Sequence, residues 1–221
     1  MTDRKLRRVT TALFASLTLG LAACAPPNAQ PAANPGVLQG QPGSNSTAPA
    51  SRSDAAADEG TLSETPFGAL SPVDRKLLSL VEQTSLREIT TSIWAQERSA
   101  NPAVREAARV IIEQHKDLET RDKDISTRMN LPIPGQPSPD MQVGITRMQT
   151  ETGDVFDRDY VNTLRTAHAQ ALILVSTVRA DTRNTLVRPF AGVAGDYIKT
   201  HIELLEKTGD VDYASLPVPA L

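Results

Sequence analysis

The sequence contains few of the residues on which disulfide-bonded and membrane-spanning proteins depend. Cys24 is the only cysteine among 221 residues, so no disulfide can form within the chain. Aromatic residues make up only 4% of the chain, and only three residues are histidine. After residue 21, no apolar run approaches the ~20 residues that a transmembrane helix needs. These shortages exclude a small disulfide-bonded scaffold and a multi-span membrane protein.

Positive charge is also scarce, which bears on the kind of partner to expect. The net charge is −3, and it becomes −6 when residues 1–23, with four basic residues and one acid, are removed. No basic patch indicates binding to nucleic acid. The sequence also contains no Gly-rich phosphate loop and no nucleophile elbow. We therefore expect neither a nucleic-acid partner nor an enzyme of these classes.

The N-terminus has the pattern of a bacterial lipoprotein signal. Four basic residues between Arg4 and Arg8 precede an apolar stretch over 10–21, which is too short to span a bilayer. The stretch ends in Leu21-Ala22-Ala23-Cys24, which resembles a lipobox. This resemblance implies cleavage before Cys24 and lipid attachment to that residue; the alternative is an ordinary secretory signal with a chance cysteine. The lipid would anchor the protein to the plasma membrane's outer leaflet or, in a two-membrane cell, to the outer membrane.

The composition divides the remaining chain into a tether and a folded domain. Residues 24–65 are rich in Pro, Ala, Ser, Asn and Gln and contain few large apolar residues. Such a segment buries too little surface to offset the entropy of ordering it, so we predict a disordered tether. Residues 66–221 form the predicted domain.

Helix signals follow one another through this domain, and no strand pattern interrupts them. A cap followed by proline occurs at Ser71-Pro72, Asn101-Pro102 and Ser138-Pro139, predicting helices over 72–98, from 102 to about 130, and a short one over 139–148. Helical spacing of apolar residues predicts two more helices, roughly 156–180 capped by Asp154, and 186–204 with a stop at Gly209. The fold class is therefore all-α, a four-helix bundle of two helical hairpins with a short extra helix in the long connection.

Three segments of this domain carry a family resemblance. They read LREITTSIWAQERSANPAVREAARVIIEQHKDL, FDRDYVNTLRTAHAQALILVSTVRADTRNTLVRPFA and THIELLEKTG, and together they span about residues 72–209. The pattern resembles a bacterial envelope family of unknown function, domain of unknown function 4142, whose members are described as predicted outer-membrane proteins related to ferritin-like bundles. The resemblance rests on Glu88, His115, Phe156-Asp157, His168 and His201. It implies an envelope location and a ferritin-like four-helix fold, but no established activity.

Each long helix contributes one titratable residue to a candidate site: Glu88, His115, His168 and His201. At a rise of ~1.5 Å per residue, Glu88 and His115 lie ~18 and ~21 Å from the turn near residue 100, so we expect them at the same height. His168 lies near the middle of its helix and close to that height. His201 is the outlier, which we expect one to two turns from level.

The four residues allow three interpretations. They are the ligands of one transition-metal ion, since imidazole and carboxylate suit zinc, copper or iron. Alternatively, each imidazole bonds a neighbouring polar group and fixes helix register, a layer that would loosen when its histidines protonate near pH 6. In the third, the rings reach the surface and never meet. A di-iron centre is disfavoured because no helix carries the Glu-x-x-His motif: Ile112, Arg165 and Ile198 stand three residues before the histidines.

The sequence as a whole favours a non-catalytic, lipid-anchored envelope module for binding, sensing or structure. No cofactor is required by this interpretation, and its partner would be an unknown envelope protein or small ligand. The alternative is a mononuclear metal-binding bundle that uses Glu88, His115, His168 and His201 for metal storage, sensing or a simple redox step.

Overall fold

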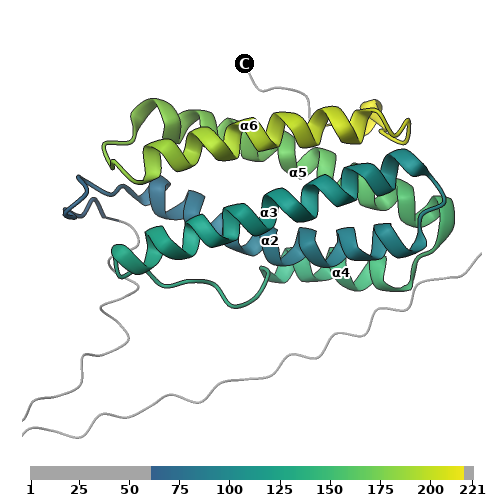
Figure 1. The fold of residues 1–221 in the computed structure, drawn as a ribbon, viewed down its shortest axis with the longest axis horizontal. Coiled ribbons are helices and arrows are strands. Elements are labelled where there is room, and N and C mark those ends of the chain that lie inside the picture. The colour runs from purple at the N-terminus through teal and green to yellow at the C-terminus, as the bar shows by residue number, and fades with distance from the viewer. Residues whose placement is uncertain (1–60, 217–221) are drawn as a thin grey trace, which may run out of the picture. The chain divides into compact units, whose positions relative to one another are not determined.

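The computed structural model describes residues 61–216, which form an all-α bundle (Figure 1). Its helices are α2 (Pro72–Arg98), α3 (Pro102–Arg128), α4 (Pro139–Thr150), α5 (Gly153–Asp181), α6 (Val187–Glu206) and the 3₁₀ turn η1 (Tyr213–Ser215). The predicted fold class, with its short extra helix in the long connection, is confirmed. The predicted signal peptide, Cys24 and nearly all of the tether lie outside the described residues.

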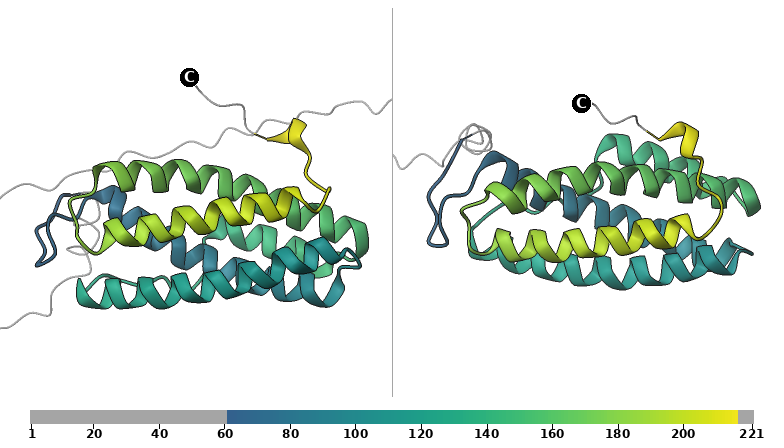
Figure 2. Two further views of the ribbon diagram at one scale, coloured as in Figure 1. Left: turned by 45° about the horizontal axis from the view of Figure 1, so that its top comes forward. Right: turned by 90° about the horizontal axis from the view of Figure 1, so that it is seen from above.

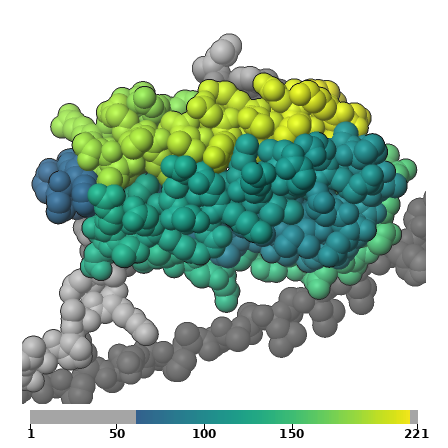
Figure 3. All heavy atoms as spheres, viewed as in Figure 1, coloured from purple at the N-terminus to yellow at the C-terminus, as the bar shows by residue number. Residues whose placement is uncertain are grey.

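The long helices form two hairpins that pack side by side. Helices α2 and α3 form one hairpin and α5 and α6 the other, with α3 against α6 and α2 against α5 (Figure 2). Figure 3 shows α3 and α6 meeting along the length of one face. Helix α4 packs against α2 and α5 on the opposite side. Each long helix therefore lines a common core.

The helix starts follow from local capping chemistry. Ser71 and Asp74 form a capping box, in which each side chain accepts a hydrogen bond from the other residue's backbone N–H. Asn101 accepts from the backbone of Ala103, and Ser138 caps α4 in the same way. Proline occupies the first helical position in all three cases, where its missing N–H costs nothing.

The second hairpin departs from the sequence prediction at one cap. Helix α5 begins at Gly153 without a side-chain cap, so Asp154 lies inside the first turn, where its charge suits the helix dipole. Helix α6 begins at Val187, and the Asn184 side chain accepts hydrogen bonds from the N–H groups of Leu186 and Val187. Gly209 has a φ of +81°, as expected for the residue that ends this helical region.

The segment before α2 folds back onto the α5–α6 turn. Ser63 and Leu70 pair their backbones, and Thr185 donates its N–H to the carbonyl of Phe67. Gly68 has a φ of +96°, and a Cβ there would lie 2.5 Å from the carbonyl oxygen of Arg183. Only glycine fits this approach, so the segment is held against the turn at the end of the bundle.

The buried side chains form two apolar clusters, one toward each end of the bundle. The cluster near the α5–α6 turn includes Leu77, Leu118, Val175, Phe190 and Ile198. The cluster near the α2–α3 turn includes Ala108, Ile111, Phe156, Tyr160 and Leu164. Between the two clusters lies a polar layer, which contains the candidate site.

Candidate metal centre

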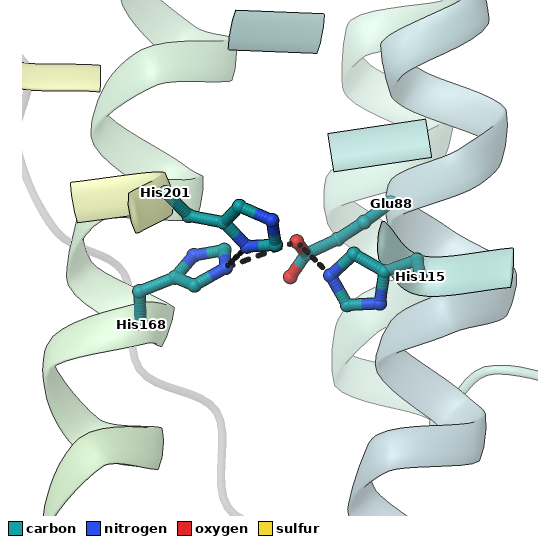
Figure 4. Close-up of side chains that lie close together, drawn as sticks. All are labelled: Glu88, His115, His168 and His201. Atoms are coloured by element: carbon teal, nitrogen blue, oxygen red, sulfur yellow. Dashed lines mark hydrogen bonds and ion pairs between the residues drawn. The ribbon is translucent and has the colours of Figure 1, made fainter. Parts of the chain in front are cut away.

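The four predicted site residues meet in the middle of the bundle, one from each long helix. Glu88, His115, His168 and His201 are 2%, 4%, 4% and 1% exposed. Figure 4 shows their side chains pointing toward one another from opposite hairpins. One donor atom from each residue can be chosen so that all four lie within 4.8 Å of one another. The interpretation in which the histidines reach the surface is wrong.

His201 is level with His168, contrary to the expected offset of one to two turns. His168 precedes the end of α5 at Asp181 by 13 residues, and His201 follows the start of α6 at Val187 by 14 residues. Because the two helices are antiparallel about one short turn, nearly equal counts place both rings ~20 Å from that turn. The predicted offset is wrong because the relative height of the two histidines is set by their nearly equal distances from the turn that they share.

The distances within the cluster are those of a compact ligand set. Nε2 of His115 lies 2.9 Å from Oε2 of Glu88, and Nε2 of His168 lies 3.5 Å from the same oxygen. Nε2 of His168 and Nδ1 of His201 are 2.8 Å apart. The ring centroids are separated by 4.8–6.3 Å. A tetrahedral ion with bonds of ~2.0–2.1 Å has ligand atoms ~3.3 Å apart, so the donor atoms, which lie within 4.8 Å of one another, would have to draw together around it.

Neighbouring groups hold three of the four side chains in place. Arg87 donates from Nη2 to Oε1 of Glu88 over 2.7 Å, which leaves Oε2 directed at the cluster. Nδ1 of His168 lies 2.7 Å from the carbonyl oxygen of Leu164, and Nδ1 of His115 lies 3.0 Å from the Ser85 hydroxyl. Second-shell partners of this kind orient imidazole and carboxylate ligands in metal sites.

The Leu164 carbonyl also fixes the tautomer of His168. A carbonyl oxygen can only accept, so Nδ1 of His168 carries the proton and Nε2 presents a lone pair to the cluster. In the metal-free state, Nδ1–H of His201 then donates to that lone pair. The tautomer is thus assigned from the hydrogen-bond network.

Several polar atoms of the cluster are buried without a hydrogen bond in the described part of the chain. They are Oε2 of Glu88, Nε2 of His115 and Nε2 of His201. The first two face each other at 2.9 Å, whereas Nε2 of His201 has no such neighbour among the contacts described. A buried polar atom without a partner costs ~1–3 kcal/mol, so Nε2 of His201 leaves room for a ligand that would complete the cluster.

The electrostatics of the cluster favour the protonation states that metal ligands require. Burial lowers the pKa of His168 and lowers that of His201 to about 2, where the neighbouring rings add to the effect. Burial by itself raises the pKa of Glu88, but His168, His115 and Arg87 together hold it well below its usual range. At neutral pH, His168 and His201 are therefore neutral and Glu88 is ionised.

A cavity of about 470 Å³ reaches the cluster. Glu88, the three histidines and Arg87 line its polar end, and its remaining wall is largely apolar. All four long helices line the cavity, and the start of α4 contributes Met141. The candidate centre is thus buried within the bundle but adjoins a space large enough for a small molecule.

Sequence reasoning missed Ser85 and Arg87. Ser85 precedes Glu88 by one helical turn, and this spacing could have identified it as a neighbour on the same face. Arg87 is adjacent to Glu88 in sequence, and nothing in the pattern indicates that its guanidinium folds back, 6% exposed, onto the carboxylate.

The fold and the site together define a helical bundle with a buried Glu/His₃ cluster that could hold a metal ion. The chain belongs to the family described as "Domain of unknown function (DUF4142)", which matches residues 59–208. No curated protein and no solved structure shows a significant match to the chain. In the described part of the chain, no helix is long and apolar enough to cross a membrane.

Proposed function

We propose that this domain binds one transition-metal ion through Glu88, His115, His168 and His201. The observation that carries the proposal is the convergence of four buried donor atoms from four helices within 4.8 Å of one another. Three imidazoles and one carboxylate suit Zn²⁺, and they also suit iron or copper. The geometry therefore favours the metal-binding alternative over a purely structural polar layer, and metal storage, sensing or a simple redox step are the roles open to it.

An unsatisfied polar atom in the cluster supports this proposal over the structural alternative. Contacts between the four residues would be enough to fix helix register, but they leave Nε2 of His201 buried without a hydrogen bond. A transition-metal ion would take up the lone pair of this atom and could also accept Oε2 of Glu88 as a ligand. It would also bind all four helices at once and so stabilise the bundle.

Elemental analysis of the purified chain, expressed without a metal-binding tag, tests the proposal. The expected result is about one equivalent of a transition metal in the wild-type protein and none in a His115→Ala/His168→Ala double variant. Tyr160→Phe is the matched control, because it removes a buried hydroxyl that bonds Ser92 and is not a ligand. If zinc, iron, copper and manganese all fail to bind the folded wild-type chain, the histidines are core polar residues and the proposal is wrong.

We also infer that the metal centre is displayed in the cell envelope on a lipid anchor. The basic residues before residue 10, the apolar stretch and the Leu21-Ala22-Ala23-Cys24 sequence support this location. Cell fractionation of wild type and Cys24→Ser tests it. Wild type should be found with the membranes, and the variant should be released into a soluble fraction. Equal distribution of the two would contradict lipid anchoring.

A further inference from the structure

The wall of the cavity beside the cluster is divided into a charged end and an apolar body. The charged end consists of the Arg87–Glu88 ion pair, beside which the three histidines lie. Leu77, Val81, Leu118, Ala171, Leu174 and Ile198 form much of the body. Small-molecule sites combine an apolar wall with a few placed polar groups in this way, at volumes of ~300–1,000 Å³.

The charge at the inner end requires an anion once a metal is present. Arg87 carries one positive charge and Glu88 one negative charge, and they neutralise each other over 2.7 Å. Metal-bound histidines are neutral, so a divalent ion leaves the loaded cluster with an uncompensated charge of about +2. An uncompensated buried charge is costly, and a negatively charged ligand group would relieve it.

The other charged side chains near the cavity do not supply this compensation. Lys76 and Asp140 lie at its exposed mouth and have opposite charges. Asp117 is engaged by Arg121 and by the hydroxyl of Tyr197. Glu82 faces Lys123 at 3.7 Å. The compensating anion must therefore come from outside the chain.

Arg87 has a donor available for that anion. Its Nη2 bonds Glu88, but its Nε is buried and has no hydrogen-bond partner among residues 61–216. Arg87 is 6% exposed and lines the cavity. A carboxylate bound there would satisfy this donor and lie beside the metal.

We propose that the cavity binds a small aliphatic carboxylate, with its head group at Arg87 and the metal-binding cluster and its hydrocarbon chain along the apolar wall. The positive charge of the metal-loaded cluster favours the carboxylate head group. Burial against leucine, valine and alanine favours the hydrocarbon chain of the ligand. This proposal rests on the proposed metal site for most of the charge at the inner end. It adds the class of small molecule that the cavity binds, which the four metal-binding side chains by themselves do not specify.

Calorimetric titration of the purified chain with octanoate, acetate and 1-octanol tests the proposal after metal content has been measured in the same sample. Octanoate should bind the metal-loaded chain at least ~10-fold more tightly than acetate, because six more methylenes are buried. It should also bind at least ~10-fold more tightly than 1-octanol, which has no charge. Chelation of the metal should weaken octanoate binding and leave 1-octanol binding unchanged.

A pair of variants on α5 separates the cavity from the rest of the helix. Ala171→Trp fills the apolar body and should abolish octanoate binding while metal content remains at one equivalent. Ile173→Trp is the matched control, because Ile173 is 71% exposed on the same helix and does not line the cavity. It should bind octanoate as the wild type does.

Each unfavourable outcome identifies which proposal fails. Equal binding of octanoate and acetate, or unchanged octanoate binding in folded Ala171→Trp, overturns the cavity proposal even if the metal is present. A wild-type chain without metal overturns the proposed function. The cavity proposal then survives only if octanoate still binds more tightly than 1-octanol through Arg87, and it falls if the two bind equally.

Discussion

Carboxyl groups are buried in two polar clusters along the α2–α3 hairpin, and their pKa values are shifted in opposite directions in the two clusters. Glu88 bonds Arg87, and His168, His115 and Arg87 together hold its pKa well below the usual range despite its burial. Glu82 and Asp122 lie about two turns away, and each is 2% exposed. Burial raises the pKa of both, and that of Asp122 reaches about 7. The carboxyl groups of both clusters are buried, so the opposite directions of their pKa shifts come from the side chains that surround them.

The second group, which we call the Glu82–Asp122 pair, has few favourable neighbours. Ser126 donates to Asp122 over 3.3 Å, and Lys123 lies 3.7 Å from Glu82. Glu82 raises the pKa of Asp122, and Glu119 raises the pKa of Glu82; the pair has no imidazole among the partners described. A buried carboxylate stays charged only where basic groups face it, as they do at Glu88. The first group is therefore suited to bind a cation, whereas the second is suited to hold a proton.

Removing Glu88 should have the largest effect on stability. Glu88→Leu would leave Arg87 buried without its carboxylate, at a cost of about 3–5 kcal/mol in the metal-free protein. Urea unfolding at pH 7 measures this loss. Glu82→Leu is the matched control, and it should cost far less because the carboxylate that it removes is poorly compensated. Equal losses of unfolding free energy in the two variants would show that the surrounding side chains do not make Glu88 and Glu82 different.

Metal removal should have the next largest effect. Binding to the folded state alone stabilises it by about 4 kcal/mol when the free metal is at 1,000 times its dissociation constant. Chelation should therefore lower the melting temperature of the wild type and of Glu82→Gln by similar amounts. It should leave His115→Ala/His168→Ala unchanged. A melting temperature that responds to the chelator in the double variant would place the stabilising ion elsewhere.

Asp122→Asn should stabilise the protein by about 2–4 kcal/mol at pH 8. The Asp122 pKa is about 7 in the folded state, against a reference value of 3.8, so ionisation above pH 7 costs folding energy. The folded state binds the extra proton between those values, and the gain should shrink as the pH falls toward 4. Urea unfolding at pH 8 and pH 4 checks this. A gain that is independent of pH would contradict the raised pKa.

The smallest predicted effect concerns the pH dependence of the metal-free bundle. The pKa of His201 is about 2 in the folded state and about 6.5 when unfolded, so the unfolded chain binds more protons below pH 6.5. Stability should fall with decreasing pH, and His201 contributes about 1.4 kcal/mol per pH unit. His201→Asn keeps a donor for His168 but cannot titrate. Its slope between pH 6 and pH 4.5 should be shallower than that of the chelated wild type, and an equal slope would exclude His201 as the cause.

The helices could be predicted because their signals are local. Ser71, Asn101 and Ser138 cap the helices that follow, and the proline after each occupies a position where no hydrogen bond is lost. Asp154 was predicted as a cap and lies inside α5, because the chain begins that helix at Gly153 with no side-chain cap. Short-range chemistry thus gave the element bounds to within a few residues, as is usual for helix ends.

The membership of the candidate site could also be inferred from sequence, but its geometry could not. Glu88, His115, His168 and His201 were identified as one polar residue on each buried helix face. Their separation depends on which helices are antiparallel neighbours and on where the turns begin. The 2.8 Å contact between His168 and His201 follows from the α5–α6 turn at residues 182–186, which sets the register of that hairpin.

By itself, the sequence determined the all-α class, the helix bounds and the four candidate ligands, since these depend on caps, prolines and the spacing of residues along one helix. Only the tertiary structure decided that the four ligands share one point, that Arg87 folds back onto Glu88, and that an apolar cavity adjoins them. The physical reason is that these features arise between helices. Packing, burial and electrostatic coupling between distant residues fix them, and no local pattern encodes them.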